Sequence, residues 1–153
     1  MKTSNKGVDF IKSFEHFSPK SYICPAGFQT IGYGHVVSRH DHFDEISETY
    51  AEELLTKDLC LAETAVHRNI TAPLEQNQFD ALVSFVFNLG SGSLQRSSLR
   101  QKINYGSDED EIRSEFVKWI YAGGKRLLGL LRRREAEAGM YLCGARNYTI
   151  SYS

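Results

Sequence analysis

The stretch that decides this fold lies between residues 15 and 30 and reads EHFSPKSYICPAGFQT. It starts at the end of an expected helix, because Val8, Ile11 and Glu15 follow one another at spacings of three and four and share one helical face. Ser4 or Asn5 can cap this helix at its N-terminus. Burial and the negative end of the helix dipole both disfavour a charged carboxylate at position 15. Glu15 is therefore a candidate general acid, although a glutamate at the edge of the stripe that reaches solvent would give the same pattern.

A small hairpin is predicted directly after this helix. Ser18-Pro19 breaks the helical pattern, and the turn sequence Pro25-Ala26-Gly27 separates two short segments rich in aromatic and β-branched residues, 20–24 and 28–33. A helix followed by a hairpin brings Glu15 to one wall of a groove, with the hairpin on the facing side.

The hairpin carries a spaced motif, Glu15-x8-Cys24-x5-Thr30, which runs into IGYGH at 31–35. This pattern resembles the catalytic signature of the phage lysozymes of glycoside hydrolase family 24. In that family the middle position is Asp in many members and Cys in others, so Cys24 resembles the less common form. Three further matches follow in the same order along the chain: QFDALVSFVFNLG (78–90), AGGK (122–125) and GLLRRREAE (129–137).

The resemblance, which covers roughly residues 8 to 142, implies an α+β, lysozyme-like and mainly helical fold. A small β-hairpin lobe, about residues 12–58, would be joined by a long helix to a helical lobe, about residues 1–11 and 59–145, with the cleft between them. We expect one catalytic domain over 1–153 and no separate wall-binding module.

By the same resemblance the protein is expected to be an endolysin, a muramidase that hydrolyses the β-1,4 bond between N-acetylmuramic acid and N-acetylglucosamine. Glu15 would protonate the leaving oxygen, and Thr30 would orient a water molecule, which favours inversion. Cys24 stands where a carboxylate is usual, and a free thiol has a pKa of about 8.5. The sequence leaves open whether Cys24 acts as a base toward water or as a nucleophile.

Three other residues have weaker assignments. Asn88 is either a substrate-binding group near Glu15 or a satisfied helix-end amide, and Lys125 either contacts Glu15 or the saccharide or is a solvated lysine. His35 is expected to be structural, hydrogen-bonded under the hairpin, with Glu63 as a plausible partner.

Helical periodicity and capping residues predict the rest of the chain. Ser47 is the expected N-cap of a long helix. The segment from 75 to 89 is apolar nearly all round, which is typical of the buried centre of a bundle. The helices are expected at about 47–69, 75–89, 98–105, from 107 onward and 130–143, with a polar or strand-like tail over 144–153.

Composition excludes several classes of protein. The formal net charge is −1, so no global charge points to nucleic acid. The three cysteines are odd in number and widely spaced, which argues against a disulfide framework and a thiolate zinc site. His40, His42 and Asp44 could be taken for a metal site, but we favour an exposed loop and expect neither metal nor cofactor.

Residues 1–7 lack the apolar run of a signal peptide, and the most hydrophobic window, 79–89, is too short to span a bilayer. We expect a monomer made in the cytoplasm of a bacterial host. It would reach periplasmic peptidoglycan only after a holin-type partner has permeabilised the membrane.

Three alternatives remain at this stage. A lytic transglycosylase would cut the same bond without water, using one acid. The segment 124–143, rich in leucine and arginine, could act as a cationic amphipathic helix that disrupts membranes. An inactive wall-binding relative is the third, and the intact Glu15 and Thr30 argue against it.

Overall fold

The computed structural model describes residues 1–143, and the expected tail over 144–153 lies outside the described residues. Helices predominate, with a small three-stranded sheet near the N-terminus and a two-stranded one near the C-terminus, as expected for a mainly helical α+β fold. The elements are α1 (Asn5–Glu15), β1 (Ser18–Ile23), β2 (Gln29–Gly32), β3 (His35–Val36), α2 (Glu48–Asn69), α3 (Gln76–Leu89), α4 (Ser91–Arg96), α5 (Ser98–Tyr105), α6 (Glu109–Val117), β4 (Tyr121–Ala122), β5 (Lys125–Arg126) and α7 (Leu128–Cys143).

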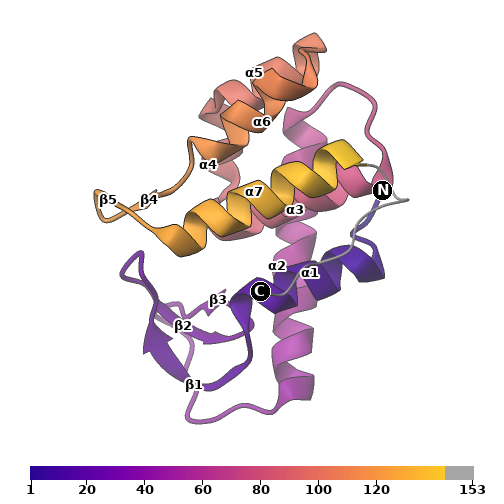
Figure 1. The fold of residues 1–153 in the computed structure, drawn as a ribbon. Helices are drawn as coiled ribbons and strands as arrows, with labels where there is room; N and C mark the ends of the chain where they lie inside the picture. The colour runs from indigo at the N-terminus through magenta and orange to yellow at the C-terminus, as the bar shows by residue number, and fades with distance from the viewer. Residues whose placement is uncertain (144–153) are drawn as a thin grey trace.

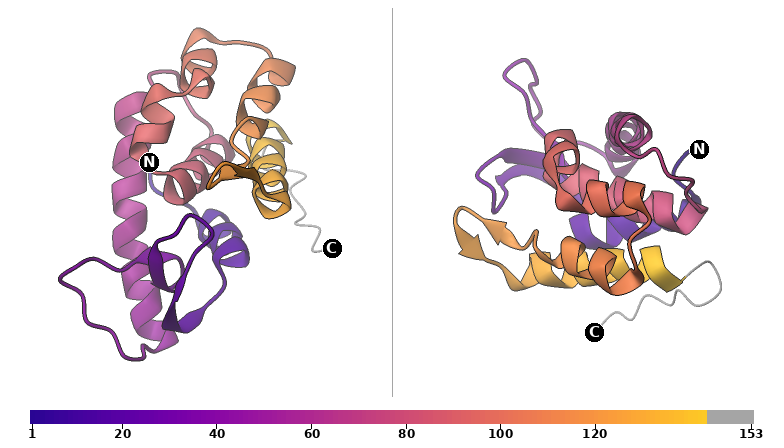
Figure 2. Two further views of the ribbon diagram at one scale, coloured as in Figure 1. Left: turned by 90° about the vertical axis from the view of Figure 1, so that its left-hand side faces the viewer. Right: turned by 90° about the horizontal axis from the view of Figure 1, so that it is seen from above.

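The long helix α2 joins the two parts of the molecule. Its 22 residues make it about 33 Å long. Figure 1 shows the sheet toward its lower end and helices α4, α5 and α6 toward its upper end, with α1 at the height of its middle. Ser47 caps it by accepting a hydrogen bond from the Tyr50 N–H at 3.1 Å. The predicted helix from Ser47 to Asn69 is confirmed. The left view of Figure 2 shows the same division from another side.

The hairpin expected after α1 belongs to an antiparallel sheet of order β1-β2-β3. Thr30 pairs with Tyr22 on one side and with Val36 on the other. The third strand was not predicted, since two residues carry too little pattern. It exists because Gly32 and Gly34, with φ of 66° and 72°, turn the chain back on itself after β2.

Helix α3 forms the centre of the helical part, as its apolar sequence predicts. Its buried residues run from Phe79 to Val86, and it contacts α1, α2, α4 and α7. Asp80 ties α1 to it by accepting hydrogen bonds from the backbone N–H of Ser4, at 3.0 Å, and from the Ser4 hydroxyl. A Cβ at Gly7 would lie only 2.6 Å from the Asp80 carboxyl carbon, so this contact needs glycine. The N-terminal end of α1 is thereby fixed relative to the bundle.

The sequence analysis missed helix α4 and the β4–β5 hairpin, because both are short. Gly123-Gly124 does break the chain as expected, and it forms the turn between β4 and β5. The last helix begins at Leu128, two residues before the expected start. Among residues 1–143, no helix has both the length and the apolar character that crossing a membrane requires.

Candidate active site

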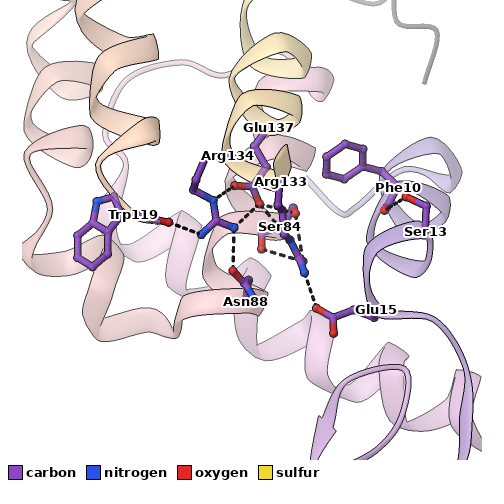
Figure 3. Close-up of polar contacts among 9 residues, drawn as sticks. All are labelled: Phe10, Ser13, Glu15, Ser84, Asn88, Trp119, Arg133, Arg134 and Glu137. Atoms are coloured by element: carbon purple, nitrogen blue, oxygen red, sulfur yellow. Dashed lines mark hydrogen bonds and ion pairs between the residues drawn. The ribbon is translucent and has the colours of Figure 1, made fainter. Parts of the chain in front are cut away.

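Glu15 is the last residue of α1, and its side chain is enclosed from two directions. On one side Arg133 of α7 donates a hydrogen bond from Nη1 to Glu15 Oε1 at 2.5 Å (Figure 3). On the other side lies Gly34, where a Cβ would collide with Glu15 Oε2. The Glu15 side chain is 15% exposed, so it stays in contact with solvent while both neighbours restrict its position.

Two arginines of α7 and one glutamate form a buried network behind Glu15. Glu137 Oε1 accepts a hydrogen bond from Arg134 Nε at 2.5 Å, and Glu137 Oε2 lies 3.5 Å from Arg133 Nε. Burial lowers the pKa of Arg134, and the charge of Glu137 opposes this effect. The sequence analysis missed this network. Its signal was the four-residue spacing from Arg133 to Glu137, which places both side chains on one helical face.

Cys24 and Thr30 lie together at the hairpin. Burial alone would raise the pKa of the Cys24 thiol. Backbone N–H groups in the turn 26–28 favour the thiolate, as does the Thr30 hydroxyl when it turns toward the sulfur, so the pKa of Cys24 lies below its ordinary value. Thr30 is 3% exposed, and its hydroxyl proton is donated to the carbonyl oxygen of Phe28 at 3.0 Å. We call the neighbouring sulfur and hydroxyl the Cys24–Thr30 unit.

Tyr22 links this unit to Glu15. Partial burial raises the pKa of Tyr22, and the negative charges of Glu15 and Cys24 raise it further. Both charges therefore lie within electrostatic reach of the Tyr22 phenol. Tyr22 was not expected at the site. Its position opposite Thr30 in the β1–β2 pairing was the available signal.

The two weaker candidates have different surroundings. Asn88, at the end of α3, accepts a hydrogen bond from Arg134 Nη2 at 2.9 Å, so it belongs to the network behind Glu15. Lys125 is exposed in β5 and, within the described chain, makes no hydrogen bond or ion pair with Glu15, whose cation is Arg133 instead. Of the alternatives left open by the sequence, contact with Glu15 is therefore wrong, a solvated lysine agrees with the structure, and contact with the saccharide stays a prediction.

His35 belongs to β3, and its side chain contacts α2, but its partner there differs from the one expected. Its Nδ1 is 2.8 Å from Asp58 Oδ2, while Glu63 accepts hydrogen bonds from Thr3 instead. The proposed pairing with Glu63 was wrong because Glu63 lies farther along α2, where the N-terminal residues cover the helix. The hydrogen bond to Asp58 is the main cause that raises the pKa of His35.

Known proteins resemble this chain over most of its length. The family model for phage lysozyme matches residues 12–137. The chain is 39% identical to an endolysin of Acyrthosiphon pisum secondary endosymbiont phage 1, over 92% of this chain and 98% of that protein. It is 40% identical to an endolysin of Bacillus phage B103 over 94% of this chain. The match covers 55% of that endolysin, so the chain spans only about half of its length.

A solved structure has the same fold. The muramidase domain of SpmX from Asticaccaulis excentricus superposes with a TM-score of 0.80 at 36% identity, over 92% of this chain and 97% of that chain. The family match and the whole-length relatives lead to one conclusion: this chain belongs to the phage lysozyme family of glycosidases.

Proposed function

We propose that this protein is an endolysin that hydrolyses the β-1,4 bond between N-acetylmuramic acid and N-acetylglucosamine in peptidoglycan. The observation that supports this most is that a Glu15 carboxyl restrained by Arg133 and Gly34 and a Cys24 thiol of lowered pKa both lie within electrostatic reach of Tyr22. A carboxyl group on one side and a water-activating group on the other is the arrangement that glycoside hydrolysis requires.

In the proposed reaction Glu15 gives its proton to the glycosidic oxygen as the bond from that oxygen to the anomeric carbon breaks. A water molecule, held by the Thr30 hydroxyl, forms the new bond to the anomeric carbon. The Cys24 thiolate takes the proton that this water loses. Exchange with solvent then returns the proton to Glu15 and restores the thiolate. Attack by water on the face opposite the leaving group gives inversion.

The lowered pKa of Cys24 suits this role. A thiol with a pKa of about 8.5 is mostly protonated at neutral pH, whereas hydrogen bonds that stabilise the thiolate make the base available. Attack by sulfur itself would give retention through a covalent intermediate. The anomeric configuration of the first product separates these two roles of Cys24.

The decisive experiment is product analysis on purified, soluble glycan strands. Hydrolysis gives a new reducing end for each bond cut, while a lytic transglycosylase gives an anhydro sugar and no reducing end. We expect reducing ends from the wild type and none above background from Glu15→Gln. Anhydro products, or full activity of Glu15→Gln, would reject the proposal.

Cys24 gives a second test within the same assay. We expect Cys24→Asp to stay active, because a carboxylate at this position can accept the proton of water. Iodoacetamide should inactivate the wild type and leave Cys24→Asp active. The exposed Cys60 and Cys143 are present in both proteins and control for alkylation elsewhere. If alkylation at Cys24 leaves wild-type activity intact, the thiol has no part in the reaction.

Access to the wall is a separate part of the proposal, taken from the family resemblance. A holin-type partner opens the membrane, without direct contact with this protein. We expect Escherichia coli that expresses the protein to lyse when chloroform permeabilises the membrane. Lysis at the same rate without chloroform would show that no such partner is needed.

A further inference from the structure

We propose that Glu137 is a positioning residue of this site, which holds Glu15 through Arg133 and Asn88 through Arg134. The inference rests on the proposed function, since it assigns Glu15 the role of the acid. Glu137 is fully buried in α7, and the reaction described above makes no use of it. A buried carboxylate with this many polar contacts calls for a physical explanation.

The first branch leads from Glu137 to the acid. Ser84 of α3 donates a hydrogen bond to Glu137 Oε2 at 2.6 Å, and Arg133 Nη2 donates to the same Ser84 hydroxyl at 3.3 Å. Arg133 Nε is buried without a hydrogen-bond partner, so its only compensation among the described residues is the charge of Glu137 at 3.5 Å. The far end of the guanidinium contacts Glu15 Oε1. Arg133 is thus fixed at both ends by carboxylates.

The second branch leads from Glu137 to α3 and the loop before β4. Glu137 accepts two hydrogen bonds from Arg134, from Nε at 2.5 Å and from Nη2 at 3.0 Å. This bidentate pair orients the guanidinium, whose Nη2 donates to Asn88 and whose Nη1 donates to the Trp119 carbonyl at 3.4 Å. Figure 3 shows both branches diverging from Glu137. One carboxylate therefore sets the positions of two arginines that point to different groups.

Charge balance makes Glu137 more than a packing residue. Arg133 and Arg134 are adjacent buried cations, 4% and 0% exposed, and the carboxylates that pair with them are Glu137 and Glu15. The groups of α3 that reach the two arginines are neutral: Ser84, Asn88 and the ring of Phe85, whose centroid is 5.2 Å from Arg134 Cζ. On the β1 side, Tyr22 lies within electrostatic reach of Glu15. Without the charge of Glu137, the only carboxylate left among residues 1–143 to pair with these two cations is Glu15.

This balance of two cations against two carboxylates predicts a change in the pH profile that a purely structural role of Glu137 would not cause. In Glu137→Gln the excess positive charge favours the ionised form of Glu15, which cannot protonate the leaving oxygen. The alkaline limb of the pH profile of kcat/KM should move to lower pH by at least half a unit. We expect kcat at pH 7 to fall about tenfold or more, because a misplaced acid lowers the rate, while KM changes less than threefold.

Glu115→Gln is the matched control. Glu115 is also buried, at 7% exposed, and its partner Lys118 is 2.7 Å away in a part of the molecule that does not contact Glu15. This control variant should lose an ion pair and keep the wild-type pH profile. A profile that moves equally in both variants would mean that general destabilisation causes the shift, and would overturn the proposal.

The double variant Glu137→Gln/Arg134→Gln keeps the experiment decisive if Glu137→Gln folds poorly, because removing both members of a buried ion pair is tolerated better than removing one. It has one cation for one carboxylate, so its alkaline limb should return to within about 0.2 units of the wild type. Its KM should rise instead, since Asn88 has lost its donor. A limb that stays displaced in the double variant would contradict the charge balance.

The single variants Glu137→Gln and Glu115→Gln and the double variant are all measured beside the wild type and Glu15→Gln on the same soluble glycan strands. An inactive wild type, or an active Glu15→Gln, rejects the proposed function. A normal wild type and an inactive Glu15→Gln, together with wild-type kcat and pH profile in Glu137→Gln, reject only the role of Glu137.

Discussion

Gly34 shows how one residue controls the candidate acid. It adopts φ of 72°, which is unfavourable for residues with a Cβ, and the missing Cβ leaves the space that the Glu15 carboxylate occupies. The turn between β2 and β3 can therefore approach α1 closely. The position of Glu15 depends on a glycine as much as on its ion pair with Arg133.

Gly34→Ala should consequently affect both stability and activity. We expect a loss of about 1–2 kcal/mol from the left-handed backbone, and at least a tenfold loss of kcat because the methyl group displaces the carboxylate. Gly106→Ala is the control: its φ is 78°, and no atom lies within 4 Å of the added Cβ. It should lose similar stability in a thermal melt and keep its kcat. Equal activity of the two variants would show that Gly34 does not restrict Glu15.

At the scale of elements, the sheet is fastened to α2 by two polar contacts. The Tyr33 hydroxyl donates to Glu48 Oε1 at 2.6 Å, and His35 contacts Asp58 at 2.8 Å. Asp41 lies in the loop between β3 and α2, and its carboxylate is 3.8 Å from His35 Nε2. Since Cys24 and Thr30 are carried by this sheet, its attachment to α2 determines where they lie.

The contact between His35 and Asp58 should make stability depend on pH. The hydrogen bond to Asp58 raises the pKa of His35 in the folded state above the value of about 6.5 expected on unfolding. The stabilisation is therefore complete below about pH 6.5 and is lost as the pH rises through the folded value. The unfolding free energy of Asp58→Asn, measured by urea titration, should fall short of the wild type most at pH 5.5 and least at pH 9.

Asp44→Asn, in the exposed loop before α2, serves as the control and should show no such trend. A difference between Asp58→Asn and the wild type that stays constant with pH would mean that Asp58 does not change the pKa of His35 in the folded protein.

At the scale of the whole molecule, α7 is a packed bundle helix. It lies against α3 and α6, and Arg133 and Arg134 point inward to Glu15, Glu137 and Asn88. A helix that disrupts membranes needs an exposed apolar face and arginines free to meet lipid. In the folded chain Arg133 and Arg134 are buried and are not free to meet lipid. Their burial argues against membrane disruption as its activity.

The intact protein should accordingly release no dye from vesicles of anionic phospholipid at concentrations that clear a cell-wall suspension. A synthetic peptide of residues 128–143, with its apolar residues and arginines no longer packed, is the positive control. Killing of permeabilised bacteria should disappear in Glu15→Gln. Leakage caused by the folded Glu15→Gln protein would establish a second activity.

Local signals were sufficient for most of the fold. Helices of eight residues or more carry periodicity and caps, and Ser47, Gly90 and Gly106 lie at the ends that the sequence predicts. Helix α4 and strands β3, β4 and β5 have two to six residues each, too few for a period to show. These short elements form because the chain around them fixes their ends.

The sequence by itself predicted the main helices, the hairpin after α1 and Glu15 as a candidate acid, because spacing along the chain and residue type are local properties. Its resemblance to the phage lysozymes added the candidates Cys24 and Thr30. Only the tertiary structure decided the partners. Glu15 meets Arg133 from 118 positions away, and His35 meets Asp58 instead of Glu63. Buried charges select partners by the exclusion of water and by the packing of distant helices, and neither is expressed in any single stretch of sequence.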